Sequence, residues 1–394
     1  MLDVAIFWLA TGTLVWVYVG YPIFIAILAQ VAPLRLLPDG QTATICVAIA
    51  VHDEADQIVE RIADALAQER SGVAIAEIIV GSDGSTDGTD GLVREAARND
   101  PRIRLLDLSR GGQTTTQNAL FEAATADIVV LTDAETRFAP GCLAALAEPF
   151  RDARVGCATG RLEWRNEDAT ATSANEGMYW QYERLVRGLE SRAGVLTAVT
   201  GALLAVRRSA WRPVPSTASM DHLVPLHVRE RGGLVVYVPT AVATDRPISG
   251  LREQFRNRTR TATRGIRANL SMIGRFAPWR RPRVAIAIWS HKLLRWATPW
   301  LVAVAAGSGF VAWADGAPAY AIAPILVAVG LLAAAIAHVV IAAGRRPPRV
   351  AAFSRSFVVV CCAFALGWIN VIRGRRIDVW HRAEWDAGAQ PRRS

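Results

Sequence analysis

Long apolar stretches flank a middle region of mixed composition. The first stretch, from Val4 to Ala29, carries no charged residue and is long enough to cross a lipid bilayer as a helix. It lacks the short apolar core and the small-residue cleavage site of a secretory signal, so the pattern predicts a retained transmembrane helix. Near the other end of the chain, uncharged stretches predict about three further spans, at residues 296–314, 316–344 and 356–372.

The middle region, from Thr42 to about Pro247, alternates short apolar runs with polar loops and with segments of helical spacing. Continuous apolar runs predict buried strands at residues 45–51, 77–80, 103–108 and 128–131. Segments of helical spacing separate these runs, as in Gln57–Gln68. Strand, polar loop and helix in repetition predict an α/β domain built on a parallel sheet with right-handed crossovers.

Two charged segments later in the chain also have helical spacing. In the predicted helix over 174–191, glutamates recur every seven residues and are interpreted as a solvated face: Glu176, Glu183 and Glu190. The segment 284–296 mixes apolar residues with basic ones and predicts an amphipathic helix at a membrane interface. Its basic residues are His291, Lys292 and Arg295.

These patterns divide the chain into five parts. They are an N-terminal transmembrane helix (1–35), an α/β domain (36–270), a basic interfacial helix region (271–295), about three transmembrane helices (296–376) and a polar tail (377–394). Arg35 follows the first span while almost nothing basic precedes it, which predicts a cytoplasmic α/β domain in a multi-pass protein of the inner or plasma membrane. Arginines after the last span would then lie outside, so either one stretch does not cross or the positive-inside rule is broken here.

Composition and charge agree with a membrane protein that carries a folded domain. Hydrophobic residues make up 52% of the chain and charged residues 20%, which is too apolar for an ordinary soluble enzyme. The net charge of +9 comes almost wholly from arginines beside apolar segments, which favours a membrane surface over nucleic acid as partner. The five cysteines show no metal-binding spacing and are interpreted as small buried residues in a reducing compartment.

Carboxylates recur at the ends of the predicted strands. Asp53 and Glu54 follow the first strand, Asp83 lies in the turn EIIVGSDGSTDGTD after the second, and Asp133 and Glu135 follow the fourth. Because carboxyl ends of parallel strands share one edge of a sheet, we expect these acids to converge on one site. An Asp-x-Glu pair offers oxygen ligands suited to Mg²⁺ or Mn²⁺. Taken singly, each acid could instead cap a helix or lie in a solvated turn.

The order of these motifs resembles that of a known family, the membrane-bound inverting family 2 glycosyltransferases, which include cellulose-, chitin- and hyaluronan-like synthases. The resemblance covers roughly residues 42–270 and rests on VAIAVHDEAD, IIVGSDGSTDGT, RGGQTTTQNAL, DIVVLTDAET, VTGALLAVRR, SMDHLVPLHV and EQFRNRTRTATRG. It implies an α/β GT-A fold (Rossmann-like and nucleotide-sugar-binding) flanked by transmembrane helices. It also implies a nucleotide-diphosphate sugar donor, a divalent metal and a single displacement with inversion.

The resemblance also implies roles for residues in the first part of the domain. Val51, Asp53 and Glu54 match the family's first loop, which lies against the nucleotide base and ribose. Asp83 matches an acid of the turn that binds the base. Asn118 matches the asparagine that closes the next donor-binding loop.

Further roles are implied in the second part of the domain. Asp133 and Glu135 match the acidic pair that holds the metal and the sugar diphosphate. Asp221 matches the final acid of the motif that supplies the general base. Arg256 and Arg258 lie where the family often places basic residues that bind diphosphate.

The chain departs from the family pattern at several positions. Gly81 and Ser82 stand in place of an acid, Gln113 stands where lysine is common, and Met220 replaces the acid before the base. The "QxxRW" signature of processive synthases is incomplete, because only its glutamine, Gln254, is present. This loss weakens the case for a synthase of long polymers.

Two classes of function follow. The first is an integral-membrane enzyme that moves a sugar onto a glycan or lipid-linked acceptor, in exopolysaccharide or cell-envelope synthesis, with polysaccharide export proteins as partners. The second is a catalytically inactive, membrane-tethered subunit that binds nucleotide sugar or supports a partner synthase. The retained acids favour the enzyme, and no motif for binding nucleic acid is present.

Overall fold

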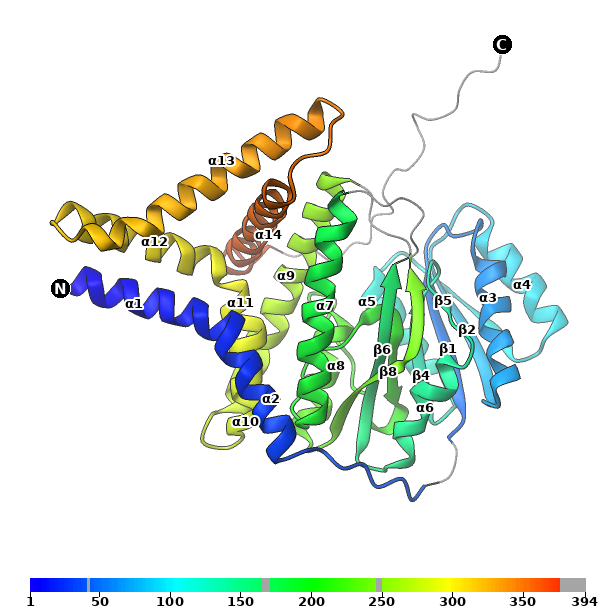
Figure 1. Cartoon of the computed structure of the whole chain (residues 1–394). Coiled ribbons are helices and arrows are strands. Elements are labelled where there is room, and N and C mark those ends of the chain that lie inside the picture. The colour runs from blue at the N-terminus through cyan, green and yellow to red at the C-terminus, as the bar shows by residue number, and fades with distance from the viewer. Residues whose placement is uncertain (41–42, 165–170, 246–249, 376–394) are drawn as a thin grey trace, which may run out of the picture.

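The computed structural model describes residues 1–40, 43–164, 171–245 and 250–375, without the side chains of 171–180. A sheet domain occupies one side of the molecule, and four apolar helices lie together on the other: α1 (Leu2–Val15), α12 (Thr298–Ala314), α13 (Ile322–Ala342) and α14 (Arg349–Ile372) (Figure 1). Between the two lie α7 (Ala171–Arg192) and α9 (Leu251–Met272), so these helices contact both parts. The predicted polar tail lies outside the described residues.

The sheet has eight strands in the order β3-β2-β1-β4-β7-β6-β8-β5. Their bounds are β1 Ile45–Val51, β2 Ile75–Asp83, β3 Ile103–Leu108, β4 Ile128–Asp133, β5 Arg137–Phe138, β6 Val155–Trp164, β7 Leu204–Arg207 and β8 Leu234–Asp245. All seven residues of β1 are buried, as expected for a central strand covered on both faces.

The prediction of a parallel sheet is right for β1 to β4, and the rest of the sheet is mixed, because β6 and β8 are parallel to each other. β7 runs antiparallel to both β4 and β6, and β5 runs antiparallel to β8. Leu204 at the start of β7 pairs with Leu131 near the end of β4. The chain therefore enters β7 at the edge where β1, β2 and β4 end, which brings the preceding loop to that edge.

Helices cover both faces of the sheet. α3 (Ile58–Ala67), α4 (Thr89–Asn99) and α6 (Cys142–Ala147) share one apolar cluster with the strands. α5 (Gln113–Ala123), α8 (Met220–Glu230) and α9 (Leu251–Met272) share a second cluster. That second cluster continues into the apolar helices through Trp296 and Phe364, so the domain and these helices have a common core.

Three helices of the described chain are long and apolar enough to cross a membrane, or up to four if one bent pair is a single span. They are Leu2–Val31 (α1 Leu2–Val15 and α2 Tyr21–Val31, joined by a π-helical turn), Pro318–Ala342 (α13 Ile322–Ala342) and Arg349–Ile372 (α14). The bent pair consists of Pro282–Trp296 and α12 (Thr298–Ala314), which meet at an angle of 67°. The first member begins with α10 (Pro282–Ala287) and ends with α11 (Leu294–Trp296).

A buried ion cluster joins α7 (Ala171–Arg192) to the segment before this bend. The Glu183 side chain is 3% exposed, and its carboxylate accepts hydrogen bonds from Lys292 Nζ at 2.9 Å and Arg295 Nη1 at 2.6 Å. Arg187 Nε and His291 Nε2 lie 3.2 and 3.3 Å from the same carboxylate. We call these residues the α7 ion cluster: Glu183, Arg187, His291, Lys292 and Arg295.

The α7 ion cluster contradicts two predictions from the sequence. Glu183 and Glu190 do not lie on a solvated face, since both are buried, and His291 bridges them. The basic side chains of the segment 284–296 point into the protein rather than toward lipid headgroups. Burial opposes ionisation of Glu183, but the charges of Arg295 and Lys292 outweigh it and hold the pKa of this carboxyl well below its usual range.

We expect Glu183→Gln to destabilise the full chain by about 3–5 kcal/mol, because it leaves buried cations without their counter-charge. Thermal unfolding of the purified protein in detergent measures the effect. Glu148→Gln is the matched control, because the Glu148 side chain is 63% exposed and pairs only with Arg151 among the described ion pairs. Equal midpoints for the two variants would contradict the structural role given to the cluster.

Candidate active site

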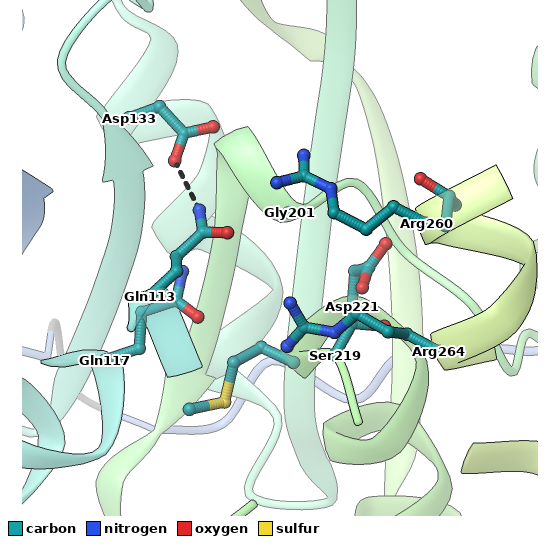
Figure 2. A pocket seen from close by; sticks show the side chains of 10 residues that line it. Gln113, Gln117, Asp133, Gly201, Ser219, Asp221, Arg260 and Arg264 are labelled. Carbon is teal, nitrogen blue, oxygen red and sulfur yellow. Dashed lines mark hydrogen bonds between the residues drawn. The ribbon is translucent and has the colours of Figure 1, made fainter. Parts of the chain in front are cut away.

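One open pocket of about 120 Å³ lies where the predicted acids were expected to converge (Figure 2). Elements that are far apart in the sequence line it: β4, α5, the loop before β7, α8 and α9. The lining residues are Gln113, Gln117, Asp133, Gly201, Ser219, Met220, Asp221, Arg260, Thr261 and Arg264. Two predicted site residues, Asp133 and Asp221, thus share one pocket.

Asp133 is the last residue of β4, and its carboxylate has a raised pKa. Burial and the nearby charge of Glu135 raise the pKa of Asp133 to about 6. Gln113 Nε2 donates a hydrogen bond of 3.4 Å to Asp133 Oδ1, so the residue that stands where lysine is common still contacts the acid (Figure 2). The buried Arg61 donates a 3.2 Å hydrogen bond to Thr132 Oγ1 and so braces the end of the strand.

Asp221 lies in the first turn of α8, on the far side of the pocket from Asp133 (Figure 2). Burial opposes its ionisation, but the charge of His222 and hydrogen bonds with His222 and Ser219 lower the pKa of Asp221 below its usual range. The carboxylate is therefore ionised at neutral pH. His222, the next residue, is only 5% exposed.

Arginines of α9 form the wall beside Asp221. Arg256, Arg260 and Arg264 recur every four residues and therefore share one face of the helix, and Arg260 and Arg264 line the pocket. Arg264 Nη2 bonds to Thr114 Oγ1 and to the carbonyl of Ala218. Burial lowers the pKa of Arg260, whereas the charges of Asp133 and Asp221 oppose that shift.

The two arginines predicted to bind diphosphate, Arg256 and Arg258, lie on different faces of α9. Arg256 is exposed on the helix face of Arg260, one turn before it. At about 100° per residue, Arg258 lies about 200° round α9 from Arg256, away from that face. Arg260 and Arg264 follow Arg256 at successive intervals of four residues. This spacing is the signal in the sequence that could have identified them.

The predicted acids at the ends of β1 and β2 lie together, but their carboxylates are engaged within the protein. Asp53 has a left-handed φ of +55° and accepts a 2.7 Å hydrogen bond from Thr86 N. Asp83 is fully buried and accepts hydrogen bonds from Gly111 N at 2.6 Å and Gly112 N at 3.0 Å. Asp83 therefore shapes the loop that leads to Gln113, and its contact with a nucleotide base stays a prediction.

Three other residues predicted to bind the donor do not line the pocket. Val51 is buried in the sheet core, and Glu54 is buried behind the first loop. Asn118 exchanges hydrogen bonds with Val214, as its Nδ2 donates to the carbonyl at 2.8 Å and its Oδ1 accepts from the amide at 3.0 Å. The predicted roles of Val51, Glu54 and Asn118 in binding the donor stay predictions.

The donor set at Asp133 and Glu135 fits a hard divalent cation. The two carboxylates lie close enough for the charge of Glu135 to raise the pKa of Asp133, and the charges of Arg260 and Arg61 offset only part of the upward shift. Within the described chain, no group of three or more His, Cys, Asp or Glu side chains could hold a metal ion. Mg²⁺ and Mn²⁺ sites commonly need only one or two carboxylates, because substrate phosphates and water complete the shell.

Several pocket residues were not predicted from the sequence. Gln117, Gly201 and Ser219 line the pocket together with Arg260 and Arg264. Gly201 lies in the turn just before β7, and a methyl group there would be 3.7 Å from the Asp221 Cβ. The motif VTGALLAVRR contains this glycine but gives it no role, and the antiparallel entry of β7 is what brings it to the pocket.

Comparison with known proteins identifies the sheet domain. Residues 46–213 match the sequence family described as glycosyl transferase family 2. An N-acetylglucosaminyltransferase of Mesorhizobium japonicum is 29% identical over 183 residues, which cover 42% of this chain and 43% of that protein. One of Rhizobium leguminosarum bv. viciae is 27% identical over 181 residues, 42% of each. The chain thus spans less than half the length of these curated relatives.

A solved structure extends the similarity in fold to the helices. The mannosyltransferase PcManGT of Pyrobaculum calidifontis, in complex with GDP-Man and Mn²⁺, has a TM-score of 0.67 at 21% identity and covers 94% of this chain and 100% of that one. At this identity the similarity establishes the fold alone, and the predicted GT-A fold is confirmed. The sheet domain of this chain thus has the GT-A fold, and its residues 46–213 are similar to glycosyltransferase family 2.

Proposed function

We propose that this protein is an integral-membrane glycosyltransferase that moves a sugar from a nucleotide-diphosphate donor to a hydroxyl group of a glycan or lipid-linked acceptor, with inversion. The observation that carries the proposal is the shared pocket of Asp133, Asp221 and the α9 arginines. The curated relatives are N-acetylglucosaminyltransferases, and the solved neighbour holds GDP-Man and Mn²⁺. The candidate spans and Arg35 support a multi-pass protein of the inner or plasma membrane with a cytoplasmic pocket.

The ionised Asp221 would act as the general base. It accepts the proton of the acceptor hydroxyl while that oxygen forms its bond to the anomeric carbon. In the same step the bond between that carbon and the diphosphate breaks, and the electron pair leaves with the diphosphate. One displacement of this kind inverts the configuration and needs no covalent sugar–enzyme intermediate.

The positive charges on the α9 wall would stabilise the departing diphosphate. Arg260 lies within electrostatic reach of both Asp133 and Asp221, so it faces the region where the negative charge develops. A divalent cation held by Asp133 and Glu135 would supply further neutralisation of the diphosphate. Gln113, bonded to Asp133, would keep that carboxylate turned toward the pocket.

The proposal predicts that the purified full chain, with Mn²⁺, releases nucleotide from at least one donor of a panel that includes N-acetylglucosamine and mannose donors. Asp221→Asn should lower turnover by about 10²- to 10⁴-fold, the usual contribution of a general base, and leave donor affinity unchanged. Chelation of the metal should abolish turnover, and added Mn²⁺ should restore it. Near-normal turnover in Asp221→Asn would contradict the role of this residue.

Failure of the wild-type protein with every donor would favour the alternative of an inactive subunit. Donor binding separates the two cases further, because an inactive subunit can still bind nucleotide sugar. Sizing of the product then distinguishes a single transfer from polymer synthesis.

The helix geometry predicts an order of effects among the α9 arginines. Arg260→Gln should weaken donor binding by about ten- to a hundredfold, as expected for loss of a hydrogen bond to a charged group. Arg256→Gln should weaken it less, and Arg258→Gln least, because Arg258 lies on another face. Calorimetric titration of the three variants with the donor measures the order, and an equal or larger loss in Arg258→Gln would contradict it.

A further inference from the structure

His222 lies one residue after Asp221 and is buried between the pocket and the candidate spans. The side chain is 5% exposed in the first turn of α8. Its Nδ1 lies 3.2 Å from Asp221 Oδ1 and 3.1 Å from Ser219 Oγ. A carboxylate can only accept hydrogen bonds, so the contact with Asp221 is favourable when Nδ1 carries the proton.

This contact restrains the Asp221 carboxylate at one of its two oxygens. The first oxygen faces the imidazole, which leaves the second oxygen for the pocket that Asp221 lines. Arg264 is less able to serve the same purpose, because its guanidinium also bonds to Thr114 and to the Ala218 carbonyl. The imidazole is therefore well placed to set the direction in which Asp221 accepts a proton.

Trp296 packs against His222. The two ring centroids are 5.5 Å apart, and Trp296 is 6% exposed. Gly265 of α9 permits this packing, since a Cβ at that position would lie 2.6 Å from Trp296 Cη2 and 3.1 Å from His222 Nε2. The imidazole is thus enclosed by α9 and by the indole.

Trp296 also has a particular place in the fold. It is the last residue before the 67° bend of the broken candidate span. Arg295, its neighbour, is anchored in the α7 ion cluster. Ion pairs therefore fix the bend of this candidate span. The side chains of Trp296 and His222 connect the bend to the proposed base, Asp221.

We propose that His222 is a positioning residue that orients the Asp221 carboxylate, and that Trp296 at the bend of the broken span holds the imidazole in place. This inference rests on the proposed function, because it assigns a partner to the proposed base. It makes proton acceptance in the pocket dependent on how the span packs against α8 and α9.

The test is steady-state kinetics of the full chain in detergent, with a donor that the panel has identified. His222→Leu should lower kcat by about tenfold or more and leave the donor KM unchanged, since it removes a hydrogen bond to a charged group. His222→Asn should retain most of kcat, because its amide N–H can donate from nearly the position of Nδ1. His227→Leu, on the same helix, is the matched control and should match wild type.

A pair of glycines tests the part played by Trp296. Gly265→Ala should lower kcat, because the added methyl displaces the indole or the imidazole. Gly274→Ala should have no effect, since nothing lies within 4 Å of a Cβ there. Donor affinity equal to that of wild type shows that each variant is folded.

The inference is overturned if His222→Leu keeps the kcat of wild type. It is also overturned if His222→Leu and His222→Asn lower kcat equally, or if His222→Leu changes only the KM for the donor. If His222→Leu fails to fold, His222→Gln takes its place in the test. Because the glutamine amide lies one carbon farther from the backbone than that of asparagine, His222→Gln should have a lower kcat than His222→Asn. Equal kcat in the glutamine and asparagine variants then overturns the inference. Absence of transfer by the wild-type protein overturns the proposed function itself, and this inference with it.

Discussion

The arrangement of the chain depends on one buried carboxylate, that of Glu183. Burial of an ionised carboxylate costs several kcal/mol unless cations surround it, and the segment before the bent span supplies two of them, Lys292 and Arg295. α7 can therefore hold its place beside the sheet only with that segment packed against it. Arg187 extends the network, since its guanidinium also donates to Thr200 Oγ1, one residue before Gly201 of the pocket. The apolar helices and the pocket edge thus share one set of ion pairs.

α9 makes a second connection between the same two parts. One face of this helix turns Arg260 and Arg264 into the pocket, while Thr263 accepts a 3.4 Å hydrogen bond from Asn370 of α14. Gly367 of α14 allows close packing, because a Cβ there would lie 2.9 Å from Ala262. The family match ends before this helix, so elements beyond the matched segment complete the pocket.

Much of the fold could be predicted from the sequence because its signals are local. Apolar runs marked β1 and β3 with the bounds that the structure has. The strand-end pattern predicted Asp133 and the family resemblance predicted Asp221, and the two residues share one pocket. The errors concern residues whose partners are distant in the chain. Glu183 looked solvated because the cations that surround it, apart from Arg187, lie 108 to 112 residues away. Charge patterns on a single helix do not reveal such partners.

We propose that one pocket carries out a single displacement, with Asp221 as base and the diphosphate leaving past the α9 arginines. The most direct measurement is the anomeric configuration of the product, determined by nuclear magnetic resonance during the first turnovers with a donor of known configuration. We expect a product whose anomeric configuration is opposite to that of the donor. A product that retains the donor configuration would contradict this proposal, because retention requires a second displacement or a different mechanism.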